Sequence, residues 1–486
     1  MANLDLELVL SDIEASAPVP SSDLERAEEF ISAHGQDLRY LVDRSQWMHQ
    51  TSNGIWEVHG GGDLSTASKV ADCVKVWASR LQAQAARMEP SEGKSLLKES
   101  RQIQSRKVIT DIVALSKSVQ GVRVQDRQLD SNPYLLGTKS GVLDLTTGSI
   151  LSGQIDNYVT RQTDVHFEPE AKCPTFERFL SAMLRDDMGQ IALMTQWLGY
   201  LLTGDVSEQK FMILHGHRGR NGKSVLFDAL QAIMGSYLSS IDKRLLTTHD
   251  NRAPFSLSVV DGARIVLASE TSREARLNTE FIKSFTAGDV MFAERKGTQG
   301  YNFRPIAKLM YAVNRMPSAD FDSSFKSRVI PVPLNQSFYD CFDPEYRDGD
   351  MKPDKDLPAK LRGEAPGILN FMIQGFNLWR ETGLIIPPSI QEHVLEFESQ
   401  NDSVGDWLAE LCEINTARKT RSSELFQSYT DYCKRLRIAR ALKLREFKAR
   451  LDVEPGIELR SHGNVPTWKG IGLIDQSTDF AGVYRG

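Results

Sequence analysis

Residues 211–234 read FMILHGHRGRNGKSVLFDALQAIM, which is an apolar run, a glycine-rich loop and a second apolar run with helical spacing. This order predicts a buried strand, a loop and a helix that begins close to Lys223. The N-terminus of a helix offers unpaired N–H groups and a partial positive charge, and both attract phosphate. We therefore predict a phosphate-binding loop whose ligand is ATP with Mg²⁺.

The residues of this loop have separate expected tasks. The loop glycines would let the backbone curl around a β-phosphate, Lys223 would reach the β- and γ-phosphates, and the Ser224 hydroxyl would bind Mg²⁺. The spacing departs from the usual one, because Gly216 lies one residue too early and His217 stands where the first loop glycine is expected. The residues assigned to ATP are Gly219, Asn221, Gly222, Lys223 and Ser224.

Three polar residues follow the loop in the order that an ATPase needs. Glu270 comes directly after the apolar run RIVLAS, and its carboxylate would hold Mg²⁺ and polarise the attacking water. Asn314 follows the run KLMYAV and would sense the γ-phosphate, and Arg328 would act as a finger in a neighbouring subunit's site. Each residue also has an ordinary explanation, as a strand end, a turn former and a surface cation. Their order along the chain favours the catalytic reading.

A basic hairpin is predicted between Glu270 and Asn314. The sequence VMFAERKGTQGYNFRP has two β-like runs around a glycine-bearing tip, from which Arg295 and Lys296 would project. Two interpretations stay open for this hairpin. It is either a solvated surface turn or a DNA-contacting finger in the pore of a ring.

The composition is that of an ordinary globular protein, with 41% hydrophobic and 25% charged residues in 486. The net charge of −6 does not indicate a nucleic-acid partner, but Thr416–Gly470 holds 13 Lys and Arg against 6 Asp and Glu, a local charge of +7. Such a basic region is what phosphate binding needs. The five cysteines are not closely spaced, so they do not form a zinc or redox motif, and we expect reduced thiols. The cysteines are Cys73, Cys173, Cys341, Cys412 and Cys433.

The N-terminus, MANLDLELVLSDIE, lacks the basic and apolar character of a signal peptide. No run reaches the roughly 20 apolar residues of a membrane span. We therefore expect a cytoplasmic protein without membrane contact, located in the host cytoplasm if a phage encodes it.

Five regions follow from the pattern along the chain. Residues 1–130 are expected to be mostly helical, and 131–204 to contain hairpins followed by a helical linker. Residues 205–335 alternate buried strands with helices, which predicts an α/β core around a parallel sheet. Residues 336–414 are expected to complete the ATPase domain as a helical region, with the helical pattern itself at 357–412, and 415–486 to form a basic C-terminal domain.

The basic C-terminal domain reads as helix, helix and hairpin, which resembles a winged-helix module. Trp468 would pack its wing. The alternative is a small basic cap with a purely structural role. The candidate phosphate-facing residues are Arg437, Arg440, Lys443, Arg445 and Lys448.

The chain from about Asn132 to Ile474 resembles the phage and plasmid primase-helicase group of superfamily-3 helicases, which includes the poxvirus primase-helicase. The segments that carry this resemblance are DGARIVLASETSREARLN, FIKSFTAGDVMFAERKG, FRPIAKLMYAVNRMP and GEAPGILNFMIQG, with NPYLLGTKSGVLDLTTG and EAKCPTF upstream. The resemblance implies an AAA+-like P-loop ATPase core, a hexamer with ATP sites between subunits, and 3′-to-5′ movement along single-stranded DNA.

By motif match, the resemblance implies the same roles for the loop, for Glu270, for Asn314 and for Arg328, and it places Lys296 on a DNA-contacting hairpin. Besides His217, two further positions depart from the family pattern. Ser269 stands where many P-loop enzymes carry a second acid, and Ser327 stands where the family often has a second arginine.

The expected function is that of an ATP-dependent replicative DNA helicase for phage or mobile-element replication, acting on single-stranded and forked DNA. A separate primase or polymerase is a candidate partner. A bifunctional primase-helicase is one alternative, since Asp5 and Glu7 mimic the spacing of a primase metal pair, although no glycine-rich β-fold surrounds them. A non-helicase P-loop motor or loader is another, and an origin-binding or repressor protein would require an inactive ATP site.

Overall fold

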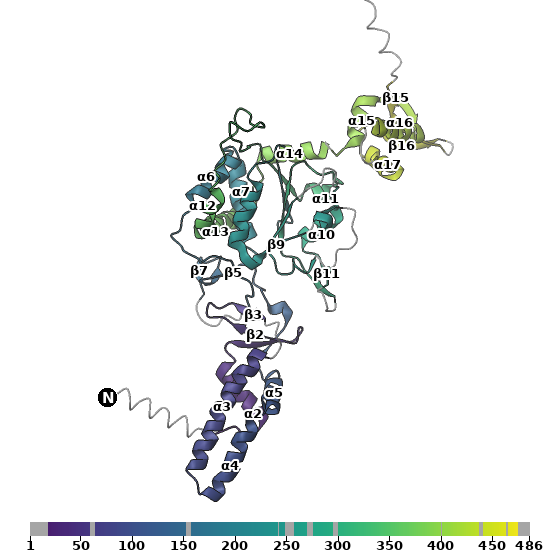
Figure 1. The fold of residues 1–486 in the computed structure, drawn as a ribbon. Helices are drawn as coiled ribbons and strands as arrows, with labels where there is room; N and C mark the ends of the chain where they lie inside the picture. The colour runs from purple at the N-terminus through teal and green to yellow at the C-terminus, as the bar shows by residue number, and fades with distance from the viewer. Residues whose placement is uncertain are drawn as a thin grey trace, which may run out of the picture.

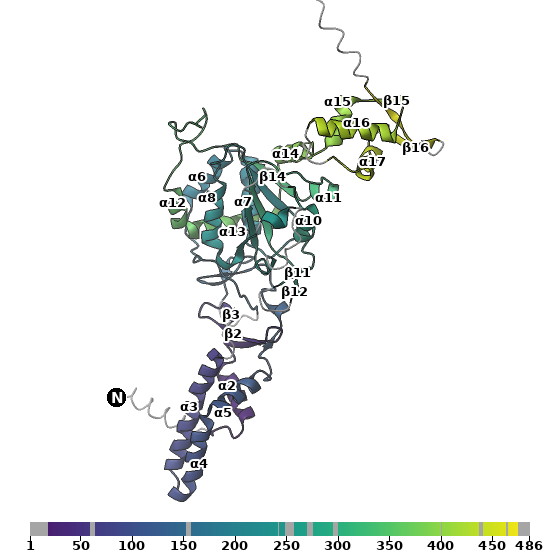
Figure 2. The same ribbon diagram turned by 45° about the vertical axis from the view of Figure 1, so that its right-hand side comes forward.

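The computed structural model describes residues 18–58, 64–151, 157–241, 243–247, 257–269, 276–294, 300–399, 401–436, 441–462 and 465–474. Figure 1 shows an elongated arrangement, with an N-terminal region of helices at one end, the core in the middle and a small C-terminal module beside the core. The turned view in Figure 2 shows the same order. No helix within the described residues is both long and apolar enough to cross a membrane.

The N-terminal region combines helices with a small sheet. Its helices are α2 (Asp23–His34), α3 (Leu64–Ala86), α4 (Pro90–Ile103) and α5 (Arg106–Ser116). The sheet has the order β3-β2-β1-β4 and was not predicted, because strands of two to five residues are too short to show a period-two pattern. Its strands are β1 (Leu38–Leu41), β2 (Gln46–Gln50), β3 (Trp56–Val58) and β4 (Arg123–Val124).

The hairpins expected after residue 131 are present as an antiparallel sheet in the order β5-β6-β7. The helices that follow it are not a linker, because they pack into the core. A Cβ on Gly375 of α13 (Ala365–Thr382) would lie 2.0 Å from the carbonyl oxygen of Thr195 on α7, so the two helices touch backbone to backbone. These elements are β5 (Leu135–Thr138), β6 (Gly141–Asp144), β7 (Ser149–Ile150), α6 (Pro174–Met183) and α7 (Met188–Leu201).

Two buried basic side chains also fix this segment to the core. The Arg264 guanidinium donates hydrogen bonds to the carbonyl oxygens of Leu135 and Leu202, and the side-chain nitrogen of Lys308 donates to that of Thr203. Burial lowers the pKa of Lys308 well below its usual value. The expected boundary at residue 204 therefore does not separate two independent bodies.

A five-stranded parallel sheet forms the core, in the order β14-β8-β13-β10-β9. The predicted buried runs coincide with β8, β10 and β13, which confirms the parallel sheet. Along β8, Met212 and Leu214 face one hydrophobic cluster, whereas Phe211 and Ile213 face the other. Both faces are covered, so the strands read as continuous apolar runs. The strands are β8 (Phe211–His215), β9 (Leu238–Ser240), β10 (Ile265–Ser269), β13 (Lys308–Val313) and β14 (Val329–Pro333).

The strand order places β13 between β8 and β10, so the carboxyl ends of these three strands lie side by side. Ligands of open parallel sheets bind at such carboxyl ends. The predicted hairpin is also present, as β11 (Met291–Ala293) paired antiparallel with β12 (Tyr301–Phe303). The remaining elements of the core are α8 (Lys223–Met234), α10 (Thr279–Ala287) and α11 (Ser323–Lys326), with short turns at η2 (Gly235–Tyr237) and η3 (Lys243–Leu246).

Within the expected region 336–414, the helices begin where the sequence predicted them, at residue 357. Residues 335–356 contain no helix or strand, and the first helix is α12 (Leu357–Gly363), followed by α13 and α14 (Pro388–Ser399). The acidic, turn-rich sequence DPEYRDGD at 343–350 accounts for the irregular backbone.

The C-terminal module begins earlier than residue 415. Its first helix, α15, buries Val404 and Trp407 in the same cluster as Tyr429, Phe447 and Trp468, so the module starts near residue 402. Trp468 is fully buried and donates to the Ser422 hydroxyl at 3.3 Å. The antiparallel sheet has the order β15-β17-β16. The elements are α15 (Ser403–Leu411), β15 (Cys412–Arg421), α16 (Ser422–Arg435), α17 (Leu444–Asp452), β16 (Glu458–His462) and β17 (Val465–Leu473).

Candidate nucleotide-binding site

The loop between β8 and α8 has the backbone of a tight phosphate cradle. Gly219, Arg220 and Gly222 have φ values of +72°, +45° and +83°, in the left-handed region that glycine tolerates best. A Cβ on Gly222 would also lie 2.9 Å from the Phe179 ring of α6, so this glycine is required by packing as well. The first turn of α8 carries no acidic residue. Its partial positive charge is therefore available to an anion.

Lys223 is held at the mouth of this cradle. Its ammonium group lies 3.2 Å from the Asn314 side-chain oxygen and 3.4 Å from the carbonyl oxygen of Gly216. Burial lowers the pKa of Lys223 to about 8. The structure thus brings together the predicted lysine and the predicted asparagine, which are far apart in the sequence, at the ends of β8 and β13.

A cavity of about 480 Å³ opens beside Lys223, a size that suits a small-molecule ligand. Its polar lining includes Lys223, Ser224, Asp228, Ser269 and Asn314. A half-buried cation, an exposed hydroxyl and an open helix N-terminus around one cavity fit a triphosphate with Mg²⁺. Glu270, the predicted catalytic carboxylate, follows Ser269 directly but lies outside the described residues.

The assignment of Asn221 to ATP suggests that its side chain faces the cavity. In the structure the side chain points away from the cavity. The side chain is 3% exposed, and its amide nitrogen lies 2.9 Å from the Leu334 carbonyl oxygen, 2.7 Å from that of Gln336 and 3.3 Å from the Ser337 hydroxyl. These contacts tie the loop to the chain that follows β14. Only the backbone of Asn221 remains for a phosphate.

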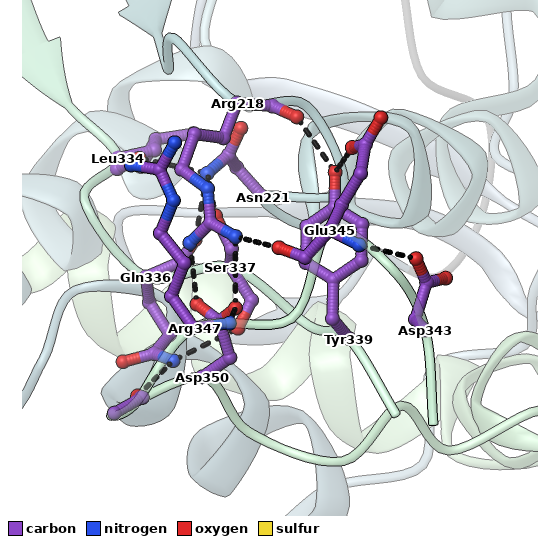
Figure 3. Close-up of polar contacts among 11 residues, drawn as sticks. Arg218, Asn221, Leu334, Gln336, Ser337, Tyr339, Asp343, Glu345, Arg347 and Asp350 are labelled. Carbon is purple, nitrogen blue, oxygen red and sulfur yellow. Dashed lines mark hydrogen bonds and ion pairs between the residues drawn. The ribbon is translucent and has the colours of Figure 1, made fainter. Parts of the chain in front are cut away.

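We name residues 334–351 the strap, because this segment covers one side of the phosphate loop (Figure 3). Arg218 pairs with Asp350 through two hydrogen bonds of 2.7 and 3.0 Å, and Arg220 pairs with Asp343 at 2.7 Å. Both guanidinium groups lie over the ring of Tyr339, at 5.1 and 4.8 Å from its centre. The hydrogen bonds from Arg218 lower the pKa of Asp350. The strap neutralises both loop arginines, so Lys223 is the loop cation that faces the cavity.

Arg328 lies at the opposite edge of the sheet, immediately before β14. Its guanidinium donates to the carbonyl and hydroxyl oxygens of Ser324 at 2.8 and 2.7 Å and to the Gln209 side chain at 3.1 Å. The Lys210 ammonium donates to the Ser327 carbonyl oxygen at 2.8 Å, and burial, with a contribution from nearby Arg328, lowers the pKa of Lys210. The five residues of β8 separate this edge from the loop by about 15 Å. Arg328 therefore cannot reach the cavity of its own chain.

Sequence reasoning did not identify Lys210, whose only sequence signal is its position just before β8. The strap was missed as well.

The DNA-binding candidates are described only in part. Arg295 and Lys296 at the hairpin tip, and Arg437 and Arg440, lie outside the described residues. On α17, Arg445 is exposed and Lys448 half-buried, and exposed Lys443 precedes the helix, with its backbone N–H donating to the Glu446 carboxylate at 2.9 Å. Arg450 has a structural role instead, since it pairs with Asp402 at 2.6 Å and with Glu454 at 2.5 Å.

Two family models match the chain. Residues 27–185 match the model described as D5 N terminal like, and residues 214–328 match a family of unknown function, DUF5906. Domains of these two kinds occur in primase-helicase-like proteins.

Viral proteins are among the relatives of the chain. It is 28% identical over 328 residues to "Putative helicase L207/L206" of Acanthamoeba polyphaga mimivirus, covering 63% of this chain and 34% of that protein. It is 22% identical over 394 residues to "Putative helicase 184R" of Invertebrate iridescent virus 6, covering 70% and 40%. The chain thus spans between a third and two fifths of the length of these relatives. Among solved structures, the apo structure of the NrS-1 C-terminal region aligns with a TM-score of 0.49 at 11% identity, covering 93% of this chain and all of that one.

Proposed function

We propose that the chain is an ATP-dependent DNA helicase of the superfamily-3 type, which acts as a hexameric ring and moves 3′ to 5′ along single-stranded DNA. The observation that carries the proposal is the pairing of Lys223 with Asn314 at the open N-terminus of α8, beside a cavity. The similarity to viral proteins named helicases supports the choice of DNA as the partner.

Each residue assigned to the ATP site has a distinct task in this proposal. Lys223 and the first N–H groups of α8 bind the β- and γ-phosphates, and the Ser224 hydroxyl turns toward Mg²⁺. Glu270 accepts a proton from the attacking water, and Asn314 orients that water. When bound, ATP with Mg²⁺ supplies the phosphoanhydride bond whose hydrolysis drives movement.

The position of Arg328 supports the proposed ring. A guanidinium that faces away from its own cavity, held by neutral oxygen atoms, is placed to stabilise phosphate charge on a neighbouring subunit. Lys210 lies beside it as a second basic side chain at that edge. Each complete ATP site then lies between two subunits.

DNA contacts are proposed at two places. The hairpin β11–β12 would direct Arg295 and Lys296 into the pore of the ring, where they hold the single strand. The C-terminal module has the element order expected of a winged helix, with Lys443, Arg445 and Lys448 together with Arg437 and Arg440 as its phosphate contacts.

Strand displacement tests this proposal. Forked duplexes with a 3′ or a 5′ single-stranded tail are incubated with the protein and ATP, and release of the labelled strand is measured. We expect release from the 3′-tailed duplex only. Glu270→Gln is the control, because it should keep ATP binding and lose hydrolysis by about 10²-fold or more.

Normal ATP hydrolysis without displacement of either duplex would contradict the helicase proposal and favour a loader or another P-loop motor. Incorporation of labelled nucleotides on a single-stranded template would instead favour the bifunctional primase-helicase.

A further inference from the structure

The long helix α4 in the N-terminal region has two different faces. Its inner face packs tightly on α3, since a Cβ on Gly93 would lie 2.7 Å from the carbonyl oxygen of Ala85. On the same side, the Gln82 amide donates to the Ser100 hydroxyl at 3.0 Å. This packing fixes the rotation of α4 about its axis, so the opposite face is turned to solvent.

The solvent face of α4 is a basic stripe. Lys94, Lys98 and Arg101 are all exposed, and their spacing places them one above the other on the helix. Together with Leu97 and Gln102 they line a shallow surface hollow of about 520 Å³. Within the described part of the chain, none of the three cations has an acidic partner, which leaves their charges open to a partner from outside.

The surroundings of the stripe strengthen its positive potential. Glu99 lies between these residues in the sequence but turns to another side, where it pairs with Arg26 of α2 at 3.1 Å. The next helix, α5, begins with Arg106 and Lys107, both exposed, and has no acid in its first turn. Cations at a helix N-terminus add to the partial positive charge of the helix instead of offsetting it.

We propose that the basic stripe of Lys94, Lys98 and Arg101 on α4 binds the phosphate backbone of duplex DNA. From Lys94 to Arg101 the stripe runs about 10 Å along the helix, and its like charges repel one another until a polyanion neutralises them. Single-strand sites add aromatic side chains on which bases stack, and the residues that line the hollow include none. Contacts of cations alone suit a duplex and are independent of its sequence.

The stripe lies far from the candidate DNA-binding residues of the C-terminal module, so it would be a separate contact with DNA. The 23 residues of α3 extend about 35 Å, and Figures 1 and 2 both show α4 at the end of the molecule remote from the C-terminal module. The inference rests on the proposed function only in taking DNA as the nucleic acid. It does not require an active ATP site.

The test compares two triple variants of the full chain. Lys94→Gln/Lys98→Gln/Arg101→Gln removes the stripe, and Lys139→Gln/Lys172→Gln/Lys355→Gln removes the same charge from exposed lysines elsewhere. Binding of a blunt duplex is measured by fluorescence anisotropy over a range of NaCl concentrations. Three lost phosphate contacts should reduce the slope of log affinity against log salt by about 2 to 3, and weaken binding at low salt at least about tenfold.

ATP hydrolysis without DNA, and the thermal unfolding midpoint, are measured for all variants and should match the unchanged protein. A wild-type slope in the stripe variant, an equal loss in the control variant, or a loss seen only with single-stranded DNA would each overturn the proposal. Loss of duplex binding by the stripe variant supports it even if the unchanged protein fails to displace strands, so the two proposals can fail separately.

Discussion

The two edges of the parallel sheet hold their cations in opposite ways. At the carboxyl edge, Lys223 is half-buried, contacts Asn314 and borders a cavity. At the amino edge, Arg328 is held by Ser324 and Gln209, beside Lys210. At the carboxyl edge the cation borders a cavity that can hold a ligand. At the amino edge the cation is held by neighbouring oxygen atoms instead.

This difference is the basis of our proposal that the catalytic groups are divided between subunits. Within one chain, about 15 Å of strand separates Arg328 from the cavity at the carboxyl edge. An arginine side chain cannot span that distance, so the two edges of one chain cannot serve the same site. A neighbouring copy resolves the mismatch, because its amino edge can face the cavity at the carboxyl edge.

The largest effect is expected at the carboxyl edge. Lys223→Ala should abolish ATP hydrolysis, because it removes the loop cation that faces the cavity and with it several kcal/mol of transition-state stabilisation. Phosphate release is the measurement, and circular dichroism checks that the variant is folded. Turnover close to that of the unchanged protein would show that the loop is not an ATP site.

At the amino edge, Arg328→Ala should reduce hydrolysis by about 10³-fold or more while ATP binding is retained, since a trans-acting finger contributes about 10³–10⁵ in rate. Lys326→Ala is the matched control, because this nearby cation pairs with Glu398 and should have little effect. If Arg328→Ala hydrolyses ATP as fast as Lys326→Ala, the amino edge takes no part in hydrolysis at the carboxyl edge.

A smaller effect is expected from pH. The pKa of Lys223 is about 8 in the free protein, so the lysine is mainly charged below pH 8 and loses its charge above it. Bound phosphate favours the charged form. Affinity for a fluorescent ATP analogue should therefore be nearly constant from pH 6.5 to 7.5 and fall by about tenfold per pH unit above pH 8.

Lys223→Arg serves as the control for this pH dependence, because a guanidinium keeps its charge throughout the range. An affinity of the unchanged protein that stays level to pH 9.5 would contradict the assignment of Lys223 to the phosphates.

Much of the core could be predicted from the sequence, because its signals are local. The runs FMILH, RIVLAS and KLMYAV are buried on both faces and stand out by composition, and the left-handed Gly219 and Gly222 lie where the loop pattern places glycines. The meeting of Lys223 with Asn314 also follows, once both strands are taken as parallel neighbours.

Other features of the structure depend on contacts between residues that are far apart in the sequence. No local sequence pattern reveals these contacts. Asn221 looks like a ligand of phosphate, yet its amide is buried against Leu334 and Gln336, more than a hundred residues later. The sheet of the N-terminal region has strands too short to show a period. The acidic run of the strap could have indicated partners for Arg218 and Arg220, but not their identity.

The most direct test of the divided site is complementation between two inactive variants. Lys223→Ala lacks a working carboxyl edge and Arg328→Ala lacks a working amino edge, so neither should hydrolyse ATP alone. Mixed under conditions in which subunit exchange is confirmed by fluorescence energy transfer, they should regain a substantial fraction of the wild-type rate, at interfaces that pair an intact loop with an intact finger. If exchange is complete and hydrolysis stays at the level of the separate variants, each chain carries its whole site and the account is wrong.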